Sequence, residues 1–413
     1  MNTYISVDDI KYQLANLRQL TFEVTDACNL KCQYCAYGEF YNDYDQRRNT
    51  VINSSAALKL IDYLVDYWKS GYNMSAVRNV YISFYGGEPL LNMNFIRMVV
   101  GYIEKLNCPQ RTFTFSMTTN AILLEKYMDF LVEHNFVLLI SLDGNERNTS
   151  YRVHKTGAPA YEDIIRNVNA LRGKYPEYFL KNVNFNAVLH NRNTVSEICR
   201  FFETNYQKIP TIGELNNVGI RPDKVDLFRK TYRNSHESLH QAENYEEIEE
   251  RMFMKSATYQ SVTNFVHQYS GFVFRNYTDL LLGKVQKTIP TGTCIPFAKR
   301  MFVTVNGKIM PCERIGQQFS LGKVTSNGVE LDLEAIVEKY NGYYAKMEPQ
   351  CSKCYKAKSC IQCVFNLNNL ESNPVCYGFT SKQGFEAYRK VQMDFLRQHP
   401  EAYYRIMEKV IIE

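Results

Sequence analysis

The chain has 413 residues, of which 45% are hydrophobic and 22% charged, and its formal net charge at pH 7 is +5. These fractions exclude a disordered or fibrous chain, and the positive excess is too small to indicate a nucleic-acid partner. The N-terminal residues are acidic where a signal peptide is basic, and no apolar run reaches the roughly 18 residues of a membrane span. We therefore expect a cytoplasmic protein without a membrane partner, in which clustered cysteines are metal ligands or redox groups rather than disulfides.

Short β-rich segments alternate with amphipathic helical segments between residues 20 and 222. We expect strands at residues 20–25, 79–86, 112–120, 136–144, 182–189 and 216–222. We expect core-facing helices, with apolar residues three and four apart, at residues 54–71, 94–107, 123–135, 161–175 and 195–206. This alternation predicts an α/β fold with a parallel sheet, in the form of a partial six-stranded (β/α) barrel. A full eight-stranded barrel is the alternative.

Three cysteines follow the first predicted strand: Cys28, Cys32 and Cys35, in the spacing C-x3-C-x2-C. This loop would lie at the C-terminal mouth of the barrel, where the active sites of such folds are found. Structural zinc needs a fourth protein ligand nearby, whereas a four-iron cluster can be held by three cysteines with one iron left open. The position and spacing favour an iron-sulfur cluster, with a zinc knuckle or redox-sensing thiols as the alternatives.

With the aromatic Tyr34 directly before the third cysteine, this motif resembles that of the radical S-adenosylmethionine (SAM) family. The resemblance implies that Cys28, Cys32 and Cys35 hold a 4Fe-4S cluster whose open iron binds SAM. It also implies that Tyr34 stacks near the adenine and that reductive cleavage of SAM gives a 5′-deoxyadenosyl radical. The chain would then be an oxidoreductase.

Further residues resemble the family's SAM contacts. Gly86, Gly87 and Glu88 begin a Gly-Gly-Glu-Pro motif that would hold the SAM amino group, because an ammonium needs a carboxylate and exposed carbonyls. A tight turn is the alternative for this motif.

Further positions extend the implied SAM site. Arg152 would form a fork to the SAM carboxylate together with Ser141, and Arg147 is a second candidate for this fork. Asn120 ends the third strand, and Asn186 on the fifth strand fits a polar position that faces the cofactor. The alternatives are solvated side chains and, for Asn186, a residue that fills the barrel.

A second group of cysteines lies near the C-terminus, at a density that packing does not require. It consists of Cys294, Cys312, Cys351, Cys354, Cys360, Cys363 and Cys376. The spacing resembles the SPASM extension of radical SAM enzymes, although Cys360 and Cys363 are separated by two residues where the family has three.

The SPASM resemblance implies two auxiliary 4Fe-4S clusters. Together with the cluster held by the first cysteine group, the chain would bind three. Cys294, Cys312 and Cys363 would hold the first auxiliary cluster, and the second would be held by Cys351, Cys354, Cys360 and Cys376. The first set is one ligand short, so we hypothesise that a substrate thiolate occupies its open iron. Zinc is the alternative here too.

The resemblance implies four segments: a radical SAM core (1–222), a helical bridge (223–290), a SPASM domain (291–380) and C-terminal helices (381–413). It implies a maturase of a ribosomally made peptide or protein that forms a thioether to Cys, with an electron donor such as flavodoxin or ferredoxin. Formylglycine formation in a sulfatase, carbon–carbon crosslinking and a non-catalytic metal-stabilised partner protein are the alternatives. Cys108 and Cys199 are interpreted as packing residues.

Overall fold

The computed structural model describes residues 4–74, 77–269 and 289–410, and the chain divides into two compact units. The sheet unit comprises Asp8–Ile248 and Ile295–Leu333. The cysteine-rich unit comprises Met1–Val7, Glu249–Cys294 and Glu334–Glu413. The two units interleave along the chain, whereas the predicted segments follow one another, and those segment boundaries stay a prediction.

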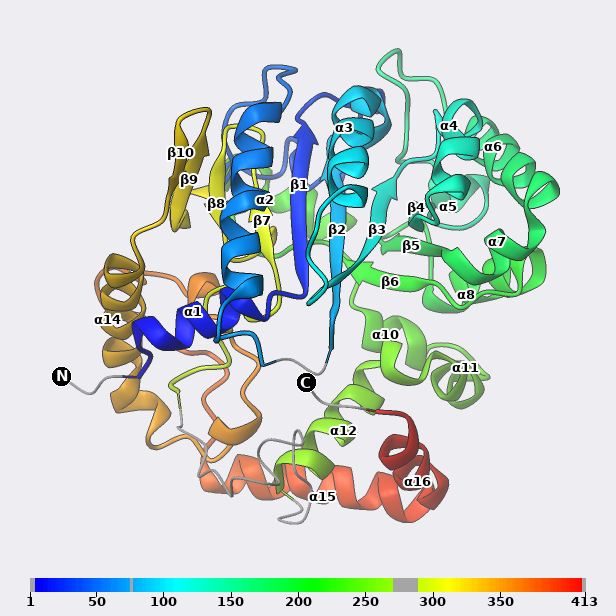
Figure 1. Cartoon of the computed structure of the whole chain (residues 1–413). Coiled ribbons are helices and arrows are strands. Elements are labelled where there is room, and N and C mark those ends of the chain that lie inside the picture. Colours follow the sequence, from blue (N-terminus) through cyan, green and yellow to red (C-terminus); the bar gives the residue numbers. More distant parts are fainter. Residues whose placement is uncertain (1–3, 75–76, 270–288, 411–413) are drawn as a thin grey trace. The chain divides into compact units, whose positions relative to one another are not determined.

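Within the described residues, the sheet unit contains one sheet of ten strands in the order β10-β9-β8-β7-β1-β2-β3-β4-β5-β6 (Figure 1). Six neighbouring strands of this sheet run parallel to one another: β1 (Gln19–Thr25), β2 (Asn79–Gly86), β3 (Thr112–Thr119), β4 (Val137–Ser141), β5 (Val183–Leu189) and β6 (Thr211–Glu214). Because these strands are parallel, their C-terminal ends meet at one edge of the sheet, which is where the first cysteine cluster follows β1.

Five of the six predicted strands are confirmed, but the sixth prediction, at residues 216–222, is wrong. The strand β6 lies earlier, at Thr211–Glu214, and pairs with β5. The predicted segment is a loop in which Gly219 has a φ of +73°, a left-handed conformation that interrupts an extended strand. Its Ile220 forms an isolated bridge with Tyr41, so this segment contacts the loop that follows the cysteines.

Four short strands that the sequence did not predict extend the sheet beyond β1. They are β7 (Met301–Val303), β8 (Lys308–Met310), β9 (Gly322–Thr325) and β10 (Gly328–Glu330). The strand β7 is parallel to β1, and the next three pairings are antiparallel. In the described part of the chain the sheet therefore ends at β10 and β6, and the eight-stranded barrel alternative is wrong.

The five predicted helices between the strands are confirmed. They are α2 (Ser54–Lys69), α3 (Met93–Glu104), α4 (Leu124–Glu133), α6 (Tyr161–Lys174) and α8 (Val195–Tyr206). Each has a local reason to form: the side chain of Asn53 caps α2, whose Leu60, Leu64 and Trp68 are buried one turn apart. At α8, Thr194 and Glu197 form a reciprocal capping box.

Short helices complete the sheet unit. They are α1 (Val7–Ala15), α5 (Glu146–Thr149), α7 (Pro176–Asn182), α9 (Val225–Thr231), α10 (Ser235–His240) and α11 (Tyr245–Met252). The first residue of α1 and the second half of α11 belong to the cysteine-rich unit.

The cysteine-rich unit contains the helices α12 (Ala257–Tyr269), α14 (Leu333–Cys351), α15 (Lys382–Gln398) and α16 (Pro400–Lys409). The first residue of α14, Leu333, still belongs to the sheet unit. Tyr259, Val262 and Val266 of α12 form a buried cluster with Ala402 and Ile406 of α16. In its described part the predicted bridge contains the helices α9 to α12 joined by short connecting segments, and its residues 270–288 lie outside the described part. None of the helices described is long and apolar enough to cross a membrane.

Candidate active site

The start of the loop that carries Cys28, Cys32 and Cys35 packs closely against two glycines at the end of β2. A Cβ atom on Gly87 would lie 2.0 Å from the carbonyl oxygen of Ala27, and one on Gly86 would lie 2.3 Å from that of Thr25. Gly86 also has a φ of +139°, which side chains rarely adopt. The backbone N–H groups of Gly87 and Glu88 donate to the carbonyls of Thr25 and Ala27, both at 2.9 Å. The glycines thus let β2 approach the start of the cysteine loop.

The three thiols lie close enough together to interact electrostatically. The Sγ of Cys28 accepts hydrogen bonds from the N–H of Leu30 at 3.4 Å and from Nδ2 of Asn120 at 3.7 Å. The pKa of Cys28 is raised to about 11 and that of Cys32 to about 12, mainly by burial and in smaller part by the neighbouring cysteines. A buried thiol is deprotonated when a metal binds it, so this arrangement suits metal coordination.

Glu88 has structural partners within the protein. Its carboxylate is 1% exposed and accepts from the N–H of Leu90 at 3.1 Å, the hydroxyl of Thr119 at 2.7 Å and the N–H of Asn120 at 2.8 Å. Burial raises its pKa to about 7. The carboxylate therefore ties the end of β3 to the turn after β2, and its predicted contact with the SAM amino group stays a prediction.

The predicted polar residues on neighbouring strands lie at the same edge of the sheet. Ser141 and Asn186 are direct partners across β4 and β5. Asn120, which is 7% exposed, donates from Nδ2 to the side chain of Asn29 at 2.8 Å, next to Cys28. The structure thus brings these three residues to the edge that carries the cysteine loop, and their roles toward SAM stay predictions.

Arg152 has a buried partner that the sequence did not reveal. Its Nε and Nη2 donate to the two carboxylate oxygens of Asp143 at 2.9 and 2.8 Å, and Asp143 is fully buried. The hydroxyl of Tyr34 also donates to Asp143. The fork that was predicted for the SAM carboxylate is thus formed with a protein carboxylate. Arg147, the second candidate, is exposed and lies 3.7 Å from Glu197.

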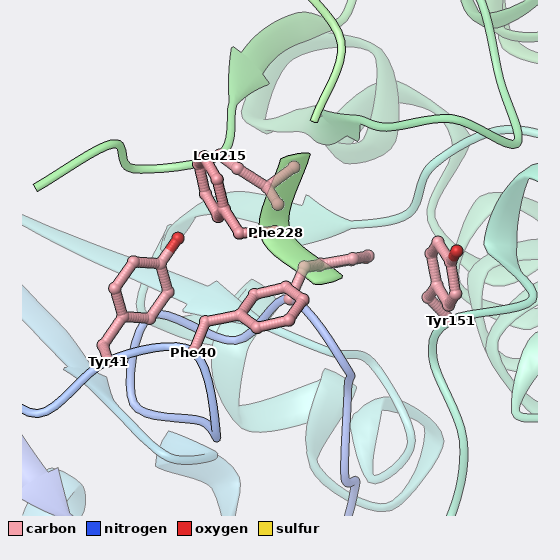
Figure 2. Packing of buried hydrophobic residues seen from close by; sticks show 6 residues of the cluster. Phe40, Tyr41, Tyr151, Leu215 and Phe228 are labelled. Atoms are coloured by element: carbon pink, nitrogen blue, oxygen red, sulfur yellow. The ribbon is translucent and has the colours of Figure 1, made fainter. Parts of the chain in front are cut away.

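Aromatic side chains surround this network. Tyr34 stacks on His190 with ring centroids 5.5 Å apart, and burial lowers the pKa of His190 to about 4, so this ring is neutral at pH 7. Tyr34 and Tyr151 belong to a buried cluster that also contains Phe40, Tyr41, Leu215 and Phe228. Figure 2 shows Phe40 and Tyr41, on the loop after the cysteines, facing Leu215 and Phe228. Sequence reasoning missed His190, since a lone histidine after a strand carries no pattern.

Four of the C-terminal cysteines, Cys351, Cys354, Cys360 and Cys376, line one cavity of about 350 Å³ in the cysteine-rich unit. The pKa of Cys351 is raised to about 11, mainly by burial and in smaller part by the other three thiols. The cavity fits the set predicted for the second auxiliary cluster. Within the described residues no three His, Cys, Asp or Glu side chains are placed to hold a single metal ion, whereas the ligands of a four-iron cluster bind separate irons.

The other predicted auxiliary ligands belong to different units. Cys294 and Cys363 lie in the cysteine-rich unit and interact electrostatically, whereas Cys312 lies in the sheet unit. This cluster's ligand set therefore stays a prediction. Cys108 and Cys199 are 4% and 2% exposed, as expected of packing residues.

Comparison with known protein families gives a match that includes the cysteine loop. The model of the radical SAM superfamily matches residues 22–204, which include Cys28, Cys32, Cys35 and the two glycines. This part of the chain is a radical SAM domain. The predicted resemblance to this family is thereby confirmed.

Known relatives of the radical SAM domain extend the comparison. Over 212 residues the chain is 30% identical to the cysteine-type anaerobic sulfatase-maturating enzyme of Clostridium novyi, which covers 49% of this chain and 54% of that protein. The chain thus spans about half the length of this relative.

Two solved structures share the fold. Native anSMEcpe with bound AdoMet has a TM-score of 0.61 at 17% identity and covers 95% of this chain and 100% of its own. Streptococcus suis SuiB bound to the precursor peptide SuiA has a TM-score of 0.50 at 15% identity, over 88% and 77% of the two chains. The fold class predicted from the sequence, a partial radical SAM barrel with a cysteine-rich C-terminal region, is confirmed.

Proposed function

We propose that this protein is a radical SAM peptide maturase that carries two auxiliary iron-sulfur clusters. The observation that carries the proposal is the loop with Cys28, Cys32 and Cys35, which lies on Gly86 and Gly87 at the C-terminal edge of the parallel sheet. A peptide or protein substrate is supported by the solved relatives, because SuiB was solved with its precursor peptide and anSMEcpe with AdoMet and the Cp18Cys peptide.

In this proposal the residues of the chain bind the cluster, orient SAM and the substrate, and enclose the site. Cys28, Cys32 and Cys35 hold the first 4Fe-4S cluster, and Asn120 donates to Cys28, a contact of the kind that orients a metal ligand. A cluster and SAM bound at this loop would supply the radical chemistry that removes a hydrogen atom from the substrate. Tyr34, directly before the third cysteine, is placed beside the adenine in this proposal. Protein groups thus contribute position and exclusion of water.

The four cysteines that line the 350 Å³ cavity hold the second auxiliary cluster in this proposal. The first auxiliary cluster is assigned to Cys294, Cys312 and Cys363, with a substrate thiolate as its remaining ligand. The reaction we favour is therefore a thioether crosslink to a substrate cysteine. The cysteine would lose its thiol proton, its sulfur would bond to the substrate carbon that has lost a hydrogen atom, and the one electron left over would pass to the auxiliary cluster. The protein would act in the cytoplasm and take electrons from a donor such as flavodoxin or ferredoxin.

Formylglycine formation in a sulfatase is the second candidate reaction, because the C. novyi relative is named a sulfatase-maturating enzyme. The sequence upstream of Cys294 contains neither Cys nor His between residues 281 and 293, so this chain offers no eighth cysteine there. That difference is why we rank thioether formation first.

The test is anaerobic reconstitution with iron and sulfide, followed by reduction in the presence of SAM. We expect about twelve iron atoms per chain, four for each of three clusters, and the formation of 5′-deoxyadenosine. Cys32→Ala should abolish SAM cleavage, whereas Cys108→Ala, a matched loss of a buried thiol outside both clusters, should leave it intact. Bound zinc without SAM cleavage, or equal effects of the two variants, would contradict the proposal and favour a non-catalytic metal protein.

A further inference from the structure

Asp143 is a buried carboxylate to which the proposed function assigns no role. It lies two residues after β4 and is fully buried. Its oxygens accept from Nε and Nη2 of Arg152, from the N–H of Val188 at 2.9 Å and from the hydroxyl of Tyr34. A buried carboxylate is costly unless it is paired and hydrogen-bonded. These four bonds meet that condition and fix the positions of the groups that donate them.

Tyr34 connects this network to the cysteines. It lies between Cys32 and Cys35 in the loop, and its ring is 7% exposed. One contact is the stack on His190, and the guanidinium carbon of Arg152 lies 5.4 Å from the Tyr34 ring centroid. The hydrogen bond from the Tyr34 hydroxyl to Asp143 therefore fixes the outer end of the side chain. The backbone of the same residue forms the turn between two proposed cluster ligands, Cys32 and Cys35.

The segment that carries Arg152 also holds the backbone of the cysteine loop. The N–H of Lys31 donates to the carbonyl of Val153 at 2.8 Å, and the N–H of Gln33 donates to the carbonyl of Tyr151 at 3.3 Å. Leu30 forms an isolated bridge with the residue after Val153. Side-chain and backbone contacts thus connect the same two segments, and Asp143 is the group that links their side chains.

We propose that Asp143 is a positioning residue of the SAM site: it holds Tyr34, and with it the turn from Cys32 to Cys35, with Arg152 as its charge partner. The inference rests on the proposed function, because it assumes that SAM binds beside Tyr34. It assigns Arg152 to the support of this turn, in place of the direct fork to the SAM carboxylate.

The test is a double-mutant cycle on the SAM dissociation constant of the reconstituted full chain, measured by anaerobic equilibrium dialysis. Asp143→Asn and Tyr34→Phe should each weaken SAM binding about tenfold, which corresponds to about 1.4 kcal/mol. Tyr34→Phe removes the hydroxyl that donates to Asp143, and Asp143→Asn replaces the charged acceptor of that hydroxyl with a weaker neutral one. Because both changes act on the same hydrogen bond, the double variant should also lose about tenfold and not about a hundredfold. The SAM-induced change in the spectrum of the reduced cluster should weaken in parallel.

Arg111→Gln is the matched control. Arg111 is 5% exposed, compared with 6% for Arg152, and its guanidinium donates to the backbone carbonyls of Ala15 and Val77. It directly precedes β3 and so lies at the opposite end of the parallel strands from the cysteine loop. The control should lower stability and leave the SAM dissociation constant within about twofold of wild type, the range that independent distant sites show.

Each other outcome overturns the inference. SAM binding that is unchanged in Asp143→Asn, a hundredfold loss in the double variant, or an equal loss in Arg111→Gln would each show that Asp143 does not act through Tyr34. If Asp143→Asn fails to fold, the comparison of Tyr34→Phe with Arg111→Gln decides in the same way. Absence of SAM binding by the wild type is a different result, because the proposed function then fails and the inference with it.

Discussion

Replacing Gly87 with alanine tests whether the contact between β2 and the cysteine loop positions the loop. The added Cβ would lie 2.0 Å from the carbonyl oxygen of Ala27, whereas real Cβ atoms stay beyond 3.0 Å. The two segments must therefore separate by about 1 Å, the difference between these two distances. Overpacking of this kind costs about 1–3 kcal/mol. The two backbone hydrogen bonds across the contact contribute about 0.5–1.5 kcal/mol each.

Together these effects predict a loss of about 2–6 kcal/mol in the free energy of unfolding for Gly87→Ala. At about 2–4 °C per kcal/mol for a unit of this size, the Tm should fall by roughly 4–24 °C. The assays are thermal unfolding by circular dichroism and the iron content after reconstitution. We expect iron to be lost as well, because the displaced segment leads directly into Cys28.

Gly101→Ala is the control for this prediction. Gly101 lies within α3, and a Cβ there would meet nothing within 4 Å. Alanine is favoured over glycine in a helix by about 1 kcal/mol, so this variant should be equally or slightly more stable. If Gly87→Ala unfolds at the wild-type temperature and retains its full iron content, the glycine pair does not position the cysteine loop and our reasoning is wrong.

Three further predictions concern stability. Burial raises the pKa of Glu88 to about 7 from 4.5, so its stabilising contribution is complete below pH 4.5 and is lost as the pH rises toward 7. Urea unfolding should show the wild-type advantage over Glu88→Gln shrinking by roughly 3 kcal/mol across that range, and a constant difference would contradict this. Trp68→Ala should cost about 3–5 kcal/mol by the same assay, because this side chain is fully buried; a loss below 1 kcal/mol would be incompatible with that burial. Lys174→Ala removes an exposed ion pair with Asp129 and should change stability by less than about 1 kcal/mol, so a larger loss would show that the pair matters more than its exposure implies.

The sequence predicted the elements whose patterns are long enough to be periodic. Each confirmed helix has at least ten residues, and the cysteine loop follows a strand with six buried residues in succession. The strands β7 to β10 have only three or four residues each, too few to establish an alternation. The sixth strand was placed too late because β6 has four residues, none of them fully buried, and carries no hydrophobic signal.

Side-chain partners distant in sequence account for what was missed at the site. Asp143 and Tyr34 are separated by 109 positions, so no local pattern could reveal that they meet. Arg152 was recognised as a residue in a SAM-binding pattern, but only the folded chain shows that its fork faces Asp143. A single acidic residue after a strand is usually solvated. The sequence therefore indicated which segment carries the site and left its internal contacts open.

The contacts of the cysteine loop explain why both glycines and a buried ion pair are found in one small region. Gly87 contacts the residue before Cys28, whereas the bonds of Tyr34 to Asp143 and of Gln33 to Tyr151 lie between Cys32 and Cys35. The loop is thus held at both ends by segments that follow β2 and β4 of the same sheet, although it has no regular secondary structure of its own. Ordering a backbone costs about 1–2 kcal/mol per residue. Because these contacts already offset the entropic cost of ordering the loop, little further ordering is needed when the loop binds a cluster. Variants that remove the contacts at either end should therefore weaken metal retention, since both contribute to the same preorganisation.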